Sequence, residues 1–149
     1  MRFKTFPICR SEKRVGLLGK FIKMQGELDT SYVHLKIQEG IIIGTYKPGL
    51  KINLEIAKEI VHVRLTFTKH KSMPALINGQ GVVSMDKAAR DFFSSKNGIK
   101  GLKAAAIIVE SPFSSFLGNF FLKVNKTRLP VKLFTNSSTA LSWLKKFVP

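Results

Sequence analysis

Residues 104–109 read Ala-Ala-Ala-Ile-Ile-Val, an apolar run that no polar residue interrupts. A strand with one face in water alternates apolar and polar residues, whereas a strand inside a parallel sheet is covered on both faces and is apolar throughout. The run therefore predicts a central parallel strand that is covered on both faces.

The chain before this run shows the period of two that is typical of strands and the period of 3.6 that is typical of helices. Val33, Leu35 and Ile37 share one side of a strand, and the turn at Glu39-Gly40 leads into a second strand. The elements expected here are a hairpin of strands at 31–38 and 41–46, a helix from the cap Asn53 to about Thr68, a strand at 73–78, and a helix with Ser84 as its N-cap.

The chain after the run completes an alternating pattern. Ser111-Pro112 begins a third helix, a strand follows at 131–134, and Asn136 or Ser137 caps a last helix. The order β-β-α-β-α-β-α-β-α predicts an α/β domain. Its sheet should be mainly parallel, with four to five strands, an antiparallel edge hairpin and flanking helices.

Several of these segments resemble a known group of proteins, the bacterial STAS-like, SpoIIAA-like family that also carries the label STAS/SEC14. The matching stretches are Leu54-Glu55-Ile56-Ala57-Lys58-Glu59-Ile60, Lys87-Ala88-Ala89-Arg90-Asp91-Phe92-Phe93, Ser111-Pro112-Phe113, Leu117-Gly118-Asn119-Phe120-Phe121-Leu122 and Ala140-Leu141-Ser142-Trp143-Leu144. The resemblance begins at about Glu27 and implies a STAS-like domain at 27–149. Residues 1–26 are expected to be a basic N-terminal extension: an added segment, an extra element that packs on the domain, or a basic amphipathic arm for a membrane surface or nucleic acid.

The resemblance also implies a function, since STAS domains are docking units and not catalysts. In the anti-sigma-factor antagonists, which share the fold, a serine at the start of one helix is phosphorylated, and this switches binding. Here Lys87-Ala88 stands at that place, so this switch is not expected. The residues expected to bind a partner are Ser84, Asp86, Lys87 and Arg90 in the β–α loop, and Phe113, Phe116 and Phe120 as an apolar contact surface.

Composition limits the further possibilities. The 149 residues carry a formal net charge of +16, which predicts non-specific attraction to polyanions. One cysteine, Cys9, rules out an internal disulfide and fits a cytoplasmic protein. No apolar run reaches the 18 residues or so of a membrane span.

The sequence predicts no catalytic, cofactor or metal site. His34, His62 and His70 lack the spacing of a zinc site, and Glu55 and Glu59 fit a solvated helix face. The leading hypothesis is a non-enzymatic STAS-like regulatory or protein-interaction module with an unknown protein partner. The alternative is a carrier of a small apolar, lipid-like ligand, and the Phe-rich helix adds possible self-association.

Overall fold

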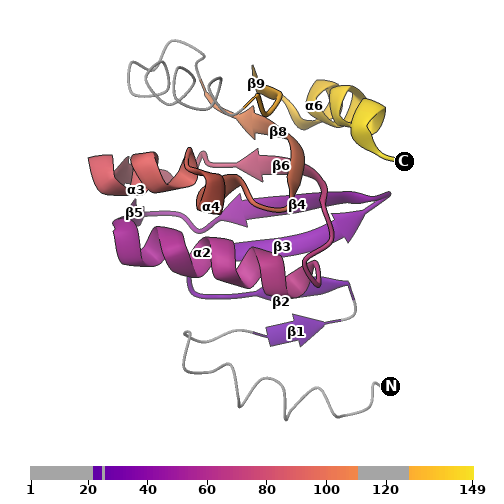
Figure 1. Cartoon of the computed structure of the whole chain (residues 1–149). Helices are drawn as coiled ribbons and strands as arrows, with labels where there is room; N and C mark the ends of the chain where they lie inside the picture. The colour runs from indigo at the N-terminus through magenta and orange to yellow at the C-terminus, as the bar shows by residue number, and fades with distance from the viewer. Residues whose placement is uncertain (1–21, 25, 111–127) are drawn as a thin grey trace.

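The computed structural model describes residues 22–24, 26–110 and 128–149 (Figure 1). Within these residues, seven strands form one sheet in the order β1-β2-β3-β4-β6-β8-β9. The strands of this sheet are β1 (Ile22–Met24), β2 (Glu27–Asp29), β3 (Val33–Gln38), β4 (Ile41–Tyr46), β6 (Met73–Asn78), β8 (Leu102–Ile108) and β9 (Val131–Phe134). Its first four strands are antiparallel neighbours, and β4, β6, β8 and β9 are parallel neighbours.

Helices lie on both faces of this sheet. The described helices are α2 (Leu54–Phe67), α3 (Lys87–Phe93), α4 (Lys96–Ile99) and α6 (Ser137–Leu144), followed by a 3₁₀ turn at Lys145–Phe147. In Figure 1, α2, α3 and α4 lie in front of the sheet, and α6 lies beside β9 at the far end of the chain.

Neighbouring residues of a strand point to opposite faces, so each inner strand contributes to two cores. On β4, Ile42 packs with Val33, Leu35 and with Val63 of α2. Its neighbour Ile41 belongs to a second cluster on the other face, whose buried members are Ile41, Leu76, Ala104, Ala106, Ile108, Ala140 and Leu144. The second cluster joins α6 to β4, β6 and β8, which confirms that the apolar run at 104–109 is covered on both faces.

The expected fold class is confirmed, and the sheet is larger than the expected four to five strands. The additional strands β1 and β2 have three residues each, which is too short for a period of two to stand out from the surrounding sequence. Strand β1 lies inside the stretch that was assigned to an N-terminal extension, and it pairs with β2 in the register Ile22↔Asp29.

A second, two-stranded sheet was also not predicted from the sequence. Strands β5 (Leu50–Ile52) and β7 (Val82–Met85) run parallel to each other, just before α2 and just before α3. The prediction that Ser84 caps α3 is therefore wrong, because Ser84 is an exposed residue of β7 that pairs with Lys51. Asp86 is the N-cap, and its Oδ1 accepts a hydrogen bond from the Ala89 N–H at 2.8 Å.

The other caps follow the sequence closely. Asn53 Oδ1 accepts the Ile56 N–H at 2.9 Å, and Asn136 Oδ1 accepts the Thr139 N–H at 2.9 Å. Each bond satisfies one of the backbone donors that the first turn of a helix leaves without an intrahelical partner. These contacts fix where α2 and α6 begin relative to the sheet.

Candidate ligand cavity

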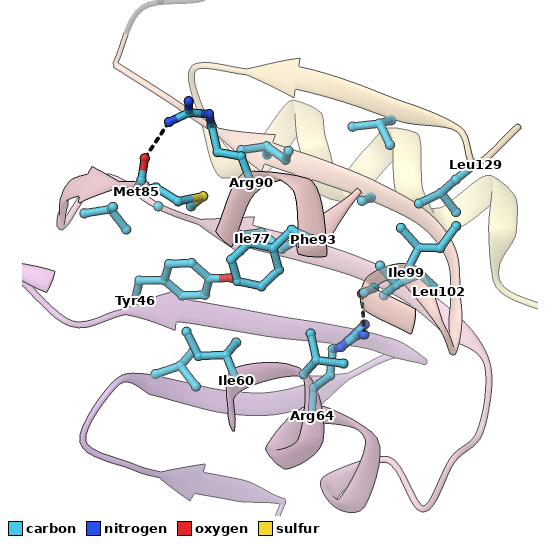
Figure 2. Close-up of a pocket in the computed structure, with 18 of the residues that line it drawn as sticks. Tyr46, Ile60, Arg64, Ile77, Met85, Arg90, Phe93, Ile99, Leu102 and Leu129 are labelled. Atoms are coloured by element: carbon cyan, nitrogen blue, oxygen red, sulfur yellow. Dashed lines mark hydrogen bonds between the residues drawn. The ribbon is translucent and has the colours of Figure 1, made fainter. Parts of the chain in front are cut away.

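A cavity of about 150 Å³ lies between the sheet and the helices α2, α3 and α4 (Figure 2). Its floor consists of residues from β3, β4, β6, β8 and β9 that point away from α6, among them Leu35, Ile77 and Ala105. Its walls include Ile60 and Val61 of α2, Phe93 of α3 and Ile99 of α4.

Small residues leave this space open. Ala105 is 4% exposed and lies in the middle of β8, where a larger side chain would project into the cavity. Gly79 and Gly98 also line it. Protein interiors are close-packed, so a space of this size is unusual. It is therefore a candidate site for a ligand.

Among the described lining residues, only three have polar side chains: Tyr46, Arg64 and Arg90. The lining is otherwise aliphatic, aromatic, thioether or glycine. Figure 2 shows the Tyr46 ring pointing from β4 into the cavity and the Arg64 side chain approaching from α2. Such a lining favours apolar ligands and offers water few hydrogen-bond partners.

The guanidinium of Arg64 is held by backbone carbonyls. Its Nη2 donates to the Gly98 oxygen and to the Lys100 oxygen, each at 3.0 Å. Burial lowers the pKa of Arg64, and a nearby Tyr46 acts in the opposite direction. Burial likewise raises the pKa of Tyr46 to about 12, with the charge of Arg64 opposing that rise. The two groups therefore lie close together in surroundings that disfavour charge.

Arg90 differs from Arg64 in its orientation. Its Nη1 donates to the Met85 oxygen at 2.5 Å, and Figure 2 shows this bond directed away from the centre of the cavity. Arg90 does not pair with Asp86, four residues before it in the helix, because Asp86 caps α3 and Arg90 holds the end of β7.

The residues predicted to bind a partner divide into three groups. Ser84, Asp86 and Lys87 are exposed and lie together where β7 leads into α3. Arg90 is on the same helix and also reaches the cavity. The apolar surface of Phe113, Phe116 and Phe120 lies outside the described residues. Next to the exposed group, Val83 is 63% exposed.

The other polar residues singled out by sequence have local explanations. His34 and Glu27 form a hydrogen bond across β2 and β3 at 2.9 Å. No group of three or more His, Cys, Asp or Glu residues that could hold a metal ion exists in the part of the chain that the structure describes. Glu55 pairs loosely with Lys58 at 3.9 Å on the exposed face of α2.

Glu59 departs from the expected solvated face. Its Oε2 is buried, and it has no hydrogen-bond partner among residues 22–24, 26–110 and 128–149. It is not among the residues that line the cavity, and it adds nothing to the cavity's chemistry.

Comparison with known proteins gives a family but no activity. A model described as "Domain of unknown function (DUF7793)" matches residues 35–148, which is most of the chain. The chain belongs to the DUF7793 family. No match is found among curated proteins. The matched range of this DUF7793 domain begins inside β3, so it leaves β1 and β2 outside.

A solved structure shares the fold of this DUF7793 chain. It is the crystal structure of an uncharacterized protein from the DUF3478 family with a SpoIIAA-like fold from Shewanella loihica PV-4. The TM-score is 0.52 at 17% identity, over 75% of this chain and 91% of that one. The SpoIIAA-like fold expected from the sequence is thereby confirmed, and the likeness extends to the fold alone.

The cavity of the DUF7793 domain was not predicted from the sequence. Its lining comes from nine parts of the chain between Val33 and Val131, and each contributes residues that a sequence pattern assigns to ordinary core. One local signal was available: Arg64 lies between Val63 and Leu65 in the helix, close to the apolar stripe of α2. No described helix is long and apolar enough to cross a membrane.

Proposed function

We propose that this domain works by binding a small apolar ligand in the cavity between the sheet and α2, α3 and α4, and that it catalyses no reaction. The observation that carries this proposal is the cavity itself, a space of about 150 Å³ with an apolar lining. A space of this size with an apolar lining accepts a molecule of roughly the size of benzene. Burial of that molecule's surface supplies the free energy of binding.

The volume limits what the ligand can be. Pockets for drug-sized ligands range from about 300 to 1,000 Å³, so this cavity suits one aromatic ring or a short alkyl chain. A two-chain lipid would have to leave most of its length outside. The carrier hypothesis from the sequence is therefore narrowed to a small ligand, or to the end of a longer one.

The experiment combines native mass spectrometry with a binding titration. Freshly purified full-length protein is weighed for a bound small molecule, and benzene is then titrated while the methyl signals of Leu35, Ile60 and Ile77 are followed by NMR. We expect saturable shifts at these methyl groups. Ala105→Leu should abolish them, because the added carbons occupy the cavity from the middle of β8.

A matched control on the same strand separates filling from general disturbance. Lys103 is exposed, and Lys103→Met adds an apolar side chain outside the cavity, so benzene binding should not change. The proposal fails if benzene produces no saturable shift in the wild-type protein. It also fails if the same methyl groups show NOEs to Phe113, Phe116 or Phe120, since the protein would then fill the space with its own side chains. That outcome needs testing because Val109 and Leu129, on either side of residues 111–127, both line the cavity.

A second candidate function, protein docking, has one observation in its favour. Val83 is 63% exposed and lies beside Ser84, Asp86 and Lys87 at the start of α3, where the resemblance places the docking site of the STAS family. A single exposed valine is common on protein surfaces, so what supports docking is the position of Val83 beside these residues. With a net charge of +16, the partner surface that fits best is acidic.

The docking hypothesis is tested by charge reversal near Val83. Arg90 holds the Met85 carbonyl, so the changes are better made at Val83 and Lys87. Affinity capture with Val83→Glu, Lys87→Glu protein should lose an acidic partner that the wild-type protein binds. Lys58→Glu on the outer face of α2 is the control and should retain it. A partner that binds both variants equally contradicts this site.

A further inference from the structure

Arg64 is a cation in the wall of an apolar cavity, and no carboxylate of the described residues pairs with it. The four ion pairs of the described residues are His34–Glu27, Lys47–Asp29, Lys58–Glu55 and Lys87–Asp91, and none includes Arg64. A charge removed from water is costly unless an opposite charge or enough hydrogen bonds compensate it. Arg64 has only part of that compensation from the described residues.

The unused part of the guanidinium can be identified. Arginine carries N–H donors on Nε, Nη1 and Nη2. Both described hydrogen bonds of Arg64 come from Nη2, which holds the Gly98 and Lys100 oxygens. Neither described hydrogen bond uses Nη1 or Nε, and neither atom is among the buried polar atoms without a partner, so both are open to solvent or to a ligand. The two carbonyl contacts also hold the guanidinium in place, so less rotamer entropy is lost when an acceptor binds.

We propose that the cavity binds a small monocarboxylic acid as its anion, with the alkyl chain or ring in the apolar space and the carboxylate on Arg64, beside the Tyr46 hydroxyl. This inference rests on the proposed function, and it adds the chemical class of the ligand. The anion supplies the opposite charge that Arg64 lacks, and charge-assisted hydrogen bonds are about twice as strong as neutral ones.

One cation selects a single negative charge. Arg90 is the other arginine of the lining, and its guanidinium is directed at the Met85 oxygen and away from the centre of the cavity. A phosphate dianion placed on Arg64 would keep one charge without a partner in apolar surroundings, which is unfavourable. The volume of about 150 Å³ limits the apolar part of the ligand to roughly six carbons, the size of benzene.

The test compares two probes that share one chain. Hexanoate and 1-hexanol have the same number of carbons, six in an unbranched chain, and differ in the charge of the terminal group. The binding of each to full-length protein is measured by NMR titration. We expect hexanoate to bind roughly 10- to 100-fold more tightly, the ratio that corresponds to a hydrogen bond with a charged group. Arg64→Met should reduce this ratio to about one. Lys58→Met removes the same charge from the exposed face of α2 and should leave the ratio unchanged.

A second measurement requires no variant, in case Arg64→Met does not fold. The Nε–H signal of Arg64 should shift on addition of hexanoate and stay in place with 1-hexanol. Equal affinity for the two probes in the wild-type protein overturns the carboxylate inference, while the proposed apolar function stands. If neither hexanoate, 1-hexanol nor benzene binds, the inference and the proposed function both fall.

Discussion

Gly98 offers a sharp test of the packing beneath α3 and α4. It is buried in α4, and a Cβ built on it would lie 2.0 Å from the Phe92 oxygen and 2.7 Å from the Phe93 Cα. Both neighbours are backbone atoms of α3, so no side chain can rotate away. Gly98→Ala therefore requires the end of α3 to move by about 1 Å, and it weakens the contact between the Gly98 oxygen and Arg64.

The cost can be placed on a scale. Overpacking of this kind costs about 1–3 kcal/mol and occasionally more, and a contact with backbone belongs at the upper end. Alanine also has less conformational entropy than glycine in the unfolded chain, which raises the free energy of unfolding by about 0.4–1 kcal/mol. The net loss in the free energy of unfolding is about 2 kcal/mol. With urea m-values of about 1–3 kcal/mol per molar, the midpoint should fall by about 1 M.

Urea unfolding followed by circular dichroism measures this change. Gly79→Ala is the matched control, because no atom lies within 4 Å of its added Cβ and its φ lies outside the left-handed region. That variant should stay within about 0.5 kcal/mol of wild type or gain slightly. A Gly98→Ala midpoint indistinguishable from that of Gly79→Ala would refute the close approach of α4 to α3.

Three further predictions concern the caps, the second core and the cavity tyrosine. Asp86→Ala removes the N-cap of α3 and should lower the free energy of unfolding in urea by about 1 kcal/mol, whereas Ser84→Ala should leave it almost unchanged. Equal losses of stability in the two variants would contradict Asp86 as the cap. Leu144→Ala, at the fully buried last position of α6, should cost about 2–5 kcal/mol, and a loss below 1 kcal/mol would contradict the α6 core. Burial raises the pKa of Tyr46 to about 12, so the folded state holds its proton to higher pH than the unfolded state does. The stability that this adds to wild type relative to Tyr46→Phe should be constant below pH 10 and fall by about 1.4 kcal/mol per unit from pH 10 to 12; a pH-independent difference between the two proteins would contradict it.

Several strands and helix caps could be predicted from the sequence because neighbouring residues determine them. The run at 104–109 became β8, an inner parallel strand between β6 and β9, and the alternation in residues 31–38 became β3. Asn53 and Asn136 cap the helices that follow them. A cap, a turn or a period of two is decided by residues within a few positions of one another, so each left a readable pattern.

The start of α3 shows where local reasoning fails. Ser84 and Asp86 are both good caps by type, and they are two residues apart. Pairing with β5 extends β7 through Met85, so the helix can begin only after that strand ends. The choice between the two caps was made by Leu50–Ile52, a segment more than thirty residues away in the sequence.

The cavity lies furthest from any sequence pattern. Arg64 and Tyr46 belong to different elements, and their common surroundings exist only because α2 packs across β4. The sequence by itself determined strands β3, β4, β6, β8 and β9 and the starts of α2 and α6, since hydrophobic period and capping are encoded residue by residue. The SpoIIAA-like class followed from the resemblance of whole segments to that family. Tertiary structure decided which small residues face one another and leave a space, and which cation borders it, because those distances depend on how whole elements pack.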